Sequence, residues 1–257
     1  MINKKNGRIQ KLEYLLKQVD RVHLSDAAEI LNVSEMTIRR DISSNVTEIV
    51  LLGGYLLKSN EKSNNYFLLE QQDKNIIEKM YLGKMAASLV ENGDVIFFDC
   101  GTTISFVASQ IPDSINFTAI CCSINTFIIL QEKLNCELLL IGGTYSRDNA
   151  MLTPFQNQNL LDNICTTKAF IATSGVDPHY GLTCFRLNEA QIKQKAIAKT
   201  RKKIIVFDHT KLNKVHSAYI DDINNFNIIL CNQSLPSEFN ISADNIATNE
   251  DELLKFR

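Results

Sequence analysis

Apolar positions follow two different patterns along the chain. From residue 9 to residue 42 they recur at intervals of three and four, which predicts helices, and the first apolar stripe consists of Ile9, Leu12, Leu16 and Val19. From residue 95 onward, short runs of continuous apolar residues alternate with helical segments, which predicts strands that are buried on both faces of a sheet. The pattern therefore indicates a small helical domain followed by a larger α/β domain.

Residues 25–42 predict two short helices joined by a tight turn. We expect Ser25 to cap the first helix and Ser34 to cap the second, because a serine hydroxyl accepts a hydrogen bond from the first turn. Asn32 falls in the turn, where asparagine tolerates a left-handed backbone. With the isoleucines of the second helix turned inward, the residues on or beside its outer face are Glu35, Met36, Arg39 and Arg40.

A helix presented in this way fits the major groove of DNA. Arg39 and Arg40 suit guanine, whose O6 and N7 accept a bidentate hydrogen bond, and each such contact gives about 1–3 kcal/mol of discrimination between bases. Ser34 and Thr37 suit phosphate contacts, which fix the register of the protein on the duplex. The predicted DNA-binding residues are Ser34, Glu35, Met36, Thr37, Arg39 and Arg40. The alternative is a plain helical hairpin with surface arginines.

The flanking segments favour the DNA-binding interpretation. Residues 48–56 contain two apolar runs around Gly53 and Gly54, which predict a two-stranded wing. Residues 1–62 contain 10 lysines and arginines against 8 acidic residues, although the formal charge of the whole chain is −2. The basic excess is therefore local and modest, as expected for a DNA-binding domain in an otherwise acidic protein.

Composition excludes several other classes of protein. The chain has 257 residues, of which 45% are hydrophobic and 22% charged, so it is long enough for two globular domains. Its seven cysteines contain no CxxC pair, which argues against a zinc site or a disulfide framework, so no metal and no cofactor are expected. No apolar run approaches the ~18 residues of a membrane span. We expect a cytoplasmic protein.

The predicted boundaries are a DNA-binding domain at 1–57, a polar linker at 58–73 and an α/β domain at 74–257. A helix is predicted over 74–91, with apolar contacts from Ile77, Met80, Met85, Leu89 and Val90, and it ends at Asn92–Gly93. The predicted strands are Val95–Phe98, Phe117–Cys122, Leu138–Ile141, Ala169–Thr173, Ile204–Phe207 and Ile228–Cys231.

Polar residues follow most of these strands. In open α/β sheets ligands bind at the carboxyl ends of the strands. Gly101, Thr102 and Thr103 fall at a predicted helix start, where backbone N–H groups and two hydroxyls suit a phosphate, although a plain tight turn explains this triplet equally well. Several such loops together indicate a site for a small phosphorylated ligand.

The segments SEMTIRRDI (34–42), DCGTT (99–103), SIN (123–125), IGG (141–143), GLT (181–183) and DHTK (208–211) resemble the DeoR family of sugar-catabolism repressors across essentially the whole chain. The resemblance implies a winged helix-turn-helix joined to an α/β sensor domain similar to ribose-5-phosphate isomerases and CoA transferases. It also implies a homo-oligomer, at least a dimer, that binds double-stranded operator DNA. A phosphorylated sugar, expected to be deoxyribose 5-phosphate, releases the DNA.

The resemblance also assigns effector contacts to individual residues of this chain. The residues that the resemblance implies are Asp99, Gly101, Thr102, Thr103, Ser123, Asn125, Gly142, Gly143, Gly181, Thr183, Lys193 and Lys211. For Lys193, the alternative of an ordinary solvated lysine is about equally favoured. Leu51 and Leu52 stand where many members carry a basic residue or histidine before the wing glycines, and Cys122–Ser123 stands where Thr-Asn is commoner. These departures affect the expected contacts of the wing and of the sugar.

Two alternatives of function stay open at the level of sequence. One is a sugar-phosphate isomerase with a helical appendage, in which Asp99, Asp177, Glu189 or Asp208 acts as a base. A DNA-binding wing has no catalytic purpose, so this alternative is disfavoured. The other is an activator built from the same parts, since the position of the operator relative to the promoter decides the sign of regulation.

Overall fold

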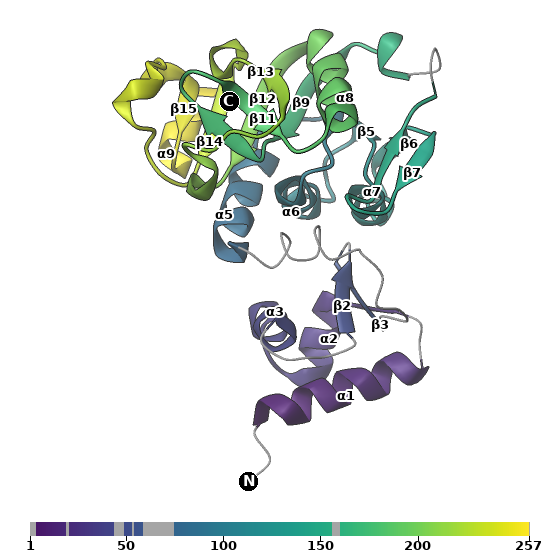
Figure 1. The fold of residues 1–257 in the computed structure, drawn as a ribbon. Coiled ribbons are helices and arrows are strands. Elements are labelled where there is room, and N and C mark those ends of the chain that lie inside the picture. The colour runs from purple at the N-terminus through teal and green to yellow at the C-terminus, as the bar shows by residue number, and fades with distance from the viewer. Residues whose placement is uncertain are drawn as a thin grey trace. The chain divides into compact units, whose positions relative to one another are not determined.

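The computed structural model describes residues 4–18, 21–43, 49–52, 54–58, 75–155 and 160–256. The chain forms two compact units, residues 1–74 and residues 75–257 (Figure 1). The predicted linker, 58–73, lies outside the described residues except for Lys58, which ends a strand.

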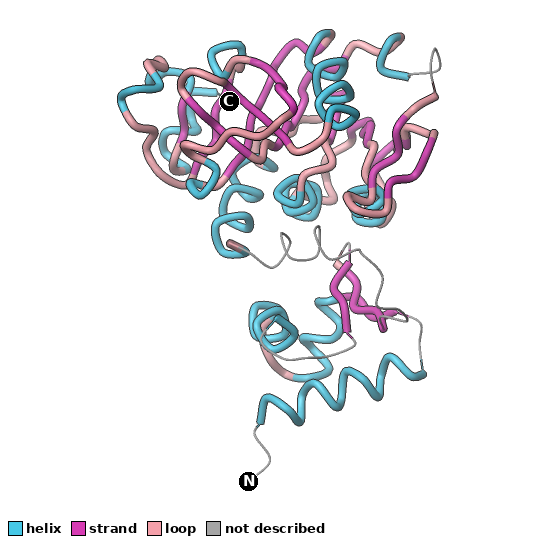
Figure 2. The backbone as a smooth tube through the Cα atoms, in the orientation of Figure 1, coloured by secondary structure: helices cyan, strands magenta, loops and turns pink. Residues whose placement is uncertain are grey.

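The described residues of the first unit form three helices and a three-stranded antiparallel sheet (Figure 2). Its elements are α1 (Lys4–Gln18), β1 (Arg21–His23), α2 (Leu24–Leu31), α3 (Glu35–Ser43), β2 (Ile49–Leu52) and β3 (Tyr55–Lys58). The predicted apolar stripes form its core, with Leu12 and Ile38 each 1% exposed. Val19, predicted to continue the stripe of the first helix, lies outside the described residues.

The turn between α2 and α3 follows the prediction, whereas the start of α2 does not. Asn32 has a left-handed backbone (φ 50°, ψ 51°), and Ser34 Oγ accepts a hydrogen bond from Thr37 N at 3.2 Å, as expected of a cap. The predicted cap Ser25 is wrong, because α2 begins at Leu24 and its cap is His23, two residues before the predicted one, whose Nδ1 accepts from Ser25 N at 3.3 Å. Strand β1 runs up to His23, so the chain passes directly from the strand into the helix.

The predicted wing is present and has a third strand. β2 and β3 pair in antiparallel register, with Leu52 opposite Tyr55, and Gly54 lies in the turn between them, as predicted, whereas Gly53 is outside the described residues. β1 pairs with the other side of β3, which gives the strand order β1-β3-β2. Sequence reasoning missed β1, since three residues are too few to show an alternating pattern.

The second unit is built on a seven-stranded parallel sheet with the order β15-β14-β12-β9-β4-β5-β6. All six predicted strands lie in it, and the seventh, β15, is only two residues long. The strands are β4 (Asp94–Phe98), β5 (Phe117–Cys121), β6 (Cys136–Leu140), β9 (Thr166–Ala172), β12 (Thr200–Phe207), β14 (Ile228–Cys231) and β15 (Ile246–Ala247).

Helices cover one face of this sheet, and a helix with a smaller sheet covers the other (Figure 1). The first face packs against α5 (Ile76–Ala87), α6 (Thr102–Gln110) and α7 (Ile124–Leu130), and the second against α8 (Leu187–Ala198) and the antiparallel strands β10 (Gly175–Asp177), β11 (Gly181–Cys184) and β13 (Ala218–Asp221). Successive strand residues serve opposite cores: Phe97 packs on the second face, and Ile96 and Phe98 pack on the first. Both faces are covered, which explains the continuous apolar runs.

Shorter elements complete the unit. They are the hairpin β7 (Thr144–Ser146) and β8 (Met151–Thr153), helix α9 (Glu250–Leu253), and 3-10 turns at Leu160–Asp162, His209–Lys211, Ile223–Asn225, Ser237–Phe239, Ala243–Asn245 and Leu254–Phe256. None of the described helices is both long and apolar enough to span a bilayer.

The predicted helix at 74–91 is shorter than expected. α5 ends at Ala87, and the apolar residues Leu89 and Val90 lie in the turn that follows it, where they are still buried. Ile77, predicted to be a core contact, is 69% exposed. The apolar run continues past the helix because the turn itself packs under the sheet, so the pattern of apolar residues overstated the length of the helix.

Candidate functional site

The outer surface of α3 is the candidate DNA-binding site. Its N-terminal turn is fixed by two serine and threonine contacts: Ser34 Oγ caps the Thr37 N–H, and the two hydroxyl oxygens lie 2.9 Å apart. Ser34 is exposed and Thr37 is half-buried. The hydroxyls predicted to contact phosphates are therefore held in a defined geometry at the start of the helix.

The two arginines of α3 differ in exposure. Arg40 is exposed, whereas the side chain of Arg39 is only 14% exposed and one of its guanidinium nitrogens lies 4.0 Å from Glu35 Oε2. Both arginines were expected on or beside the outer face, and the sequence did not distinguish between them. They are adjacent on a helix and so point about 100° apart, which places Arg39 nearer the apolar stripe.

A contact that sequence reasoning missed ties α1 to α3. Arg8 Nε donates to Asp41 Oδ2 at 2.6 Å, and the Asp41 side chain is 2% exposed. The Arg8 guanidinium neutralises a buried carboxylate, and the pair fixes α3 against α1.

The second candidate site is the carboxyl edge of the parallel sheet, defined by the residues that directly follow five strands. These are Asp99–Thr103 after β4, Cys122–Asn125 after β5, Ile141–Gly143 after β6, Thr173–Ser174 after β9 and Asp208–Lys211 after β12. The strand order brings these segments side by side, in the order β12, β9, β4, β5 and β6. The three motifs DCGTT, SIN and DHTK therefore meet at one edge although 83 to 109 positions separate the first two from the last.

A buried ion pair lies at the centre of the carboxyl edge. The ammonium group of Lys193 on α8 donates to Asp99 Oδ2, to the carbonyl oxygen of Ala172 at 3.0 Å, and lies 3.0 Å from Glu189 Oε1. Burial alone would lower the pKa of Lys193, but the charges of Asp99 and Glu189 outweigh it and raise this pKa well above its ordinary value. Lys193 is 1% exposed, so the alternative of a solvated lysine is wrong.

Several buried polar atoms at or beside this edge have no hydrogen-bond partner among the described residues. They are Asp99 Oδ1, Ser123 Oγ, Asn125 Oδ1, Thr126 Oγ1, Asn149 Oδ1 and Asp208 Oδ2. The segment that contains Asn149 lies beside this edge, because Ile124 N, just after Ser123, donates to the carbonyl of Ala150 at 2.9 Å. Buried polar groups are normally paired, and leaving one unpaired costs about 1–3 kcal/mol. Their concentration here is the pattern expected of a site for a polar ligand.

Thr126, Asn149 and Glu189 were not among the predicted effector residues. Thr126 lies one position beyond the SIN motif, and a match to the motif alone stops short of it. Asn149 precedes β8, a three-residue strand that the sequence pattern does not reveal. Glu189 was considered only as a catalytic base, and the structure instead places it against Lys193.

The predicted phosphate loop leads directly into a helix, as expected. Gly101 precedes α6, Thr102 is half-buried, and Thr103 is 5% exposed. A Cβ on Gly101 would lie 2.2 Å from Cβ of Ala172, so the loop approaches β9 more closely than any other residue type allows. The first-turn N–H groups of a helix lack partners within the helix and favour anions.

The remaining predicted effector residues have different surroundings. Gly143 has φ +139° and approaches the carbonyl of Thr153, whereas Gly142 is exposed and has open space around its Cα. Gly181 (φ +68°) lies at the start of β11, in the small sheet rather than at the carboxyl edge. Lys211 is half-buried in the turn after Asp208.

Thr183 has a structural role in this arrangement. Its hydroxyl donates to the carbonyl of Gly175 at 3.4 Å and accepts from His216 N at 3.0 Å, so it connects β11 to the segment before β13. The residue was expected to bind the effector. With its donor used, only one acceptor position of the hydroxyl is left for any ligand.

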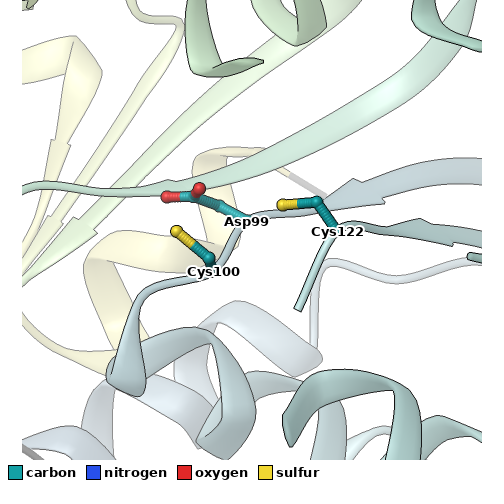
Figure 3. Close-up of side chains that lie close together, drawn as sticks. All are labelled: Asp99, Cys100 and Cys122. Carbon is teal, nitrogen blue, oxygen red and sulfur yellow. The ribbon is translucent and has the colours of Figure 1, made fainter. Parts of the chain in front are cut away.

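Asp99, Cys100 and Cys122 bring three potential metal-ligating atoms within 4.8 Å of one another (Figure 3). A hydrogen bond with Cys122, followed by burial, raises the pKa of Cys100 well above its ordinary value, so the thiol stays protonated at neutral pH. The Lys193 ammonium already neutralises Asp99. The protonated Cys100 thiol and the adjacent Lys193 ammonium disfavour a metal ion, and this cluster instead packs between the strand ends.

A winged helix-turn-helix joined to an α/β domain with a polar carboxyl edge defines a class of protein, the DNA-binding transcription regulators that carry a ligand-sensing domain. Residues 8–61 match the DeoR-like helix-turn-helix domain, and residues 74–233 match the DeoR C terminal sensor domain. The chain belongs to the DeoR family. It is a transcriptional repressor of that family and not an enzyme, which excludes the isomerase alternative.

The chain is similar to curated relatives along nearly its whole length. The chain is 40% identical over 230 residues to the deoxyribose operon repressor of Escherichia coli (strain K12), covering 90% of this chain and 91% of the relative. It is 30% identical over 232 residues to the HTH-type transcriptional regulator GolR of Listeria innocua, covering 89% and 91%. It is 26% identical over 214 residues to the lactose phosphotransferase system repressor of Staphylococcus aureus (strain N315), covering 82% and 85%.

Solved structures show a partial likeness. Ribose 5 phosphate isomerase A from Neisseria gonorrhoeae has a TM-score of 0.36 at 15% identity, covering 55% of this chain and 54% of that one. The eIF2B delta subunit from Chaetomium thermophilum has a TM-score of 0.43 at 11% identity, covering 63% and 57%.

Proposed function

We propose that the protein represses an operon for the catabolism of a sugar or deoxyribonucleoside, and that a phosphorylated sugar releases it from the operator. Deoxyribose 5-phosphate is the expected effector. The proposal takes its substrate class from the relative named deoxyribose operon repressor, with which the chain shares 40% identity over nearly its whole length. The repressor acts on chromosomal DNA, in keeping with the cytoplasmic location that the sequence predicts.

The group of unpartnered buried polar atoms at the carboxyl edge carries the proposal. All six members are carboxylate, amide or hydroxyl oxygens, which lie on Asp99, Ser123, Asn125, Thr126, Asn149 and Asp208. Sugar hydroxyls donate hydrogen bonds to such oxygens, and each bond formed removes the cost of leaving a buried oxygen without a partner. The start of α6 at Thr102 supplies the complementary environment, N–H groups and a positive helix end for a phosphate.

The DNA-binding side of the proposal rests on α3. Ser34, Glu35, Met36, Thr37 and Arg40 are exposed or half-buried on this helix, and Arg39 lies beside them with its side chain largely covered. One such helix covers a single half-site. A homo-oligomer with at least two copies would place two of them in successive major grooves, about 34–36 Å apart, on a palindromic operator.

Release follows from linkage between the two sites. A sugar phosphate that binds more tightly to a state with poor DNA affinity shifts the population toward that state, and typical coupling free energies are about 1–3 kcal/mol. A ligand that binds both states equally leaves the operator complex unchanged. Effector binding alone is therefore an insufficient test, and the operator affinity has to be measured with and without the ligand.

The test is a fluorescence anisotropy titration in which the full chain is added to an operator. The operator is selected from fragments of the promoter region adjacent to the gene of this protein. Deoxyribose 5-phosphate is expected to weaken operator binding about 5- to 150-fold at saturation, whereas unphosphorylated deoxyribose and inorganic phosphate have little effect. Ribose 5-phosphate tests whether the additional hydroxyl is rejected. No loss of the complex with any sugar phosphate would overturn the proposal.

A matched pair of asparagine variants locates the effector site. Asn125→Ala removes an unpartnered, buried amide oxygen at the carboxyl edge, and we expect the effector concentration for half-maximal release to rise at least about tenfold, the equivalent of one lost hydrogen bond. Asn135→Ala removes an exposed side chain that donates to the carbonyl of Asp113 at 2.7 Å, and it should leave release unchanged. Equal behaviour of the two variants would place the site elsewhere.

A further inference from the structure

Asn75 is the first described residue after the segment 59–74, and it opens the second unit of the chain. It directly precedes α5, where an asparagine would usually cap the helix with its side chain. Here the side chain makes no capping hydrogen bond. Its backbone is left-handed (φ 55°, ψ 43°), a conformation that asparagine tolerates better than most residues.

The side chain of Asn75 instead reaches the carboxyl edge. Its Nδ2 donates to Asp208 Oδ1 and to Thr210 Oγ1, each at 3.1 Å, across more than 130 positions of sequence. These two residues belong to the DHTK segment after β12. The covalent path from the DNA-binding unit thus enters the sensor unit at a residue that is hydrogen-bonded to one of the proposed effector loops.

Asp208 has two carboxylate oxygens in different situations. Oδ1 accepts from Asn75 Nδ2, from the Thr210 hydroxyl and from Thr210 N at 3.0 Å. Oδ2 is buried with no partner in the part of the chain that the structure describes, and the whole residue is 0% exposed. A ligand hydroxyl that donates to Oδ2 would therefore act on the same rigid carboxylate that holds Asn75.

We propose that Asn75 is a positioning residue for induction, through which occupancy of the carboxyl edge at Asp208 reaches the start of the chain segment leading to the DNA-binding unit. The proposal rests on the proposed function, since it requires that a sugar phosphate at this edge weakens operator binding. Rotation or displacement of the Asp208 carboxylate toward a ligand changes the hydrogen bonds to Asn75, and with them the orientation of the residue that begins α5.

The test uses Asn75→Gly in the full chain, because glycine keeps the left-handed backbone and removes only the side chain. Operator affinity is measured by anisotropy with and without saturating deoxyribose 5-phosphate, and effector affinity is measured by calorimetry. We expect the operator affinity without effector and the effector affinity to stay within about threefold of the unmodified protein. The factor by which effector weakens operator binding should fall at least about fivefold toward unity.

Two further variants separate positioning from general damage. Asn75→Asp keeps the shape and the tolerance of a left-handed backbone but opposes two carboxylates, so we expect it to reduce the response at least as strongly. Asn92→Ala is the matched control, since Asn92 Oδ1 accepts from Asn116 N at 2.8 Å at the opposite end of β4. It should respond to effector as the unmodified protein does.

The outcomes are distinguishable. If the unmodified protein does not respond to any sugar phosphate, the proposed function fails and this inference fails with it. If the unmodified protein responds to effector and both Asn75 variants respond as strongly as it does, only the inference is overturned. Loss of effector binding itself in Asn75→Gly would also overturn it, because Asn75 would then belong to the binding site rather than to the connection beyond it.

Discussion

Lys193 on α8 and Asp99 at the end of β4 form an ion pair whose two side chains are each 1% exposed. The pair joins a helix on one face of the sheet to a strand end at the centre of the carboxyl edge. The same ammonium group lies 3.0 Å from Glu189 Oε1, one turn earlier on the helix. The position of α8 over the edge is therefore fixed by charge as well as by apolar packing.

Removing one partner of this pair should destabilise the sensor unit strongly. Lys193→Met keeps the length of the side chain but leaves Asp99 and Glu189 without their cation, and we expect a loss of about 3–5 kcal/mol in the free energy of unfolding by urea. Lys195→Ala is the matched control on the same helix, because Lys195 pairs with Asp162 at 2.9 Å but both side chains are nearly half exposed. Its loss should stay below about 1 kcal/mol. Equal losses of unfolding free energy in the two variants would show that the buried pair stabilises the protein no more than the exposed pair does.

The two glycines Gly101 and Gly142 should respond differently to the same substitution. Gly101→Ala places a methyl group 2.2 Å from Cβ of Ala172, and the overpacking should cost about 1–3 kcal/mol and weaken effector-induced release by displacing the start of α6. Gly142→Ala meets nothing within 4 Å and should change neither quantity measurably. The measurements are urea unfolding and the anisotropy titration with effector. A Gly142 variant as damaged as the Gly101 variant would contradict this prediction.

His216 should contribute to the pH dependence of stability in the mildly acid range. Burial lowers the pKa of His216, which stacks on Phe185 with ring centroids 4.0 Å apart. The unfolded chain therefore binds a proton first, below about pH 6.5, and stability is lost as the pH falls from there through the lowered pKa of the folded state. His216→Phe keeps an aromatic ring and removes the titration. Between pH 7.5 and 5.5 it should lose less stability than the unmodified protein, and an equal or larger loss would contradict the assignment.

Arg40 should contribute more to operator discrimination than the other basic residues of the first unit. It is exposed on α3, and loss of a bidentate base contact in Arg40→Ala should weaken operator binding by about 1–3 kcal/mol, or roughly 5- to 150-fold. Binding to unrelated DNA should fall much less. Lys11→Ala, an exposed lysine on α1, is the control for general charge and should affect both DNAs alike. If Arg40→Ala weakens binding to the operator and to unrelated DNA equally, Arg40 contacts a phosphate rather than a base.

Patterns that depend on neighbours in sequence predicted much of the fold. The six apolar runs became strands of one parallel sheet, and Asn32 and Ser34 have the turn and capping roles expected of them. Predictions failed where a tertiary contact changed a local preference. His23 replaces Ser25 as a cap because β1 pairs with β3, and the small sheet of β10, β11 and β13 has strands too short to give a period.

The sequence by itself determined the division into two domains, the family, and the helices and strands that carry the candidate sites. Helix periodicity, buried strands and short motifs all depend on residues that are close together in the sequence. Only the tertiary structure decided the burial of Lys193 against Asp99, the unequal exposure of Arg39 and Arg40, and the link from Asn75 to Asp208. Burial and the pairing of charges depend on which distant segments pack together. Only packing creates a buried polar atom without a partner, the feature on which the proposed effector site at the carboxyl edge rests.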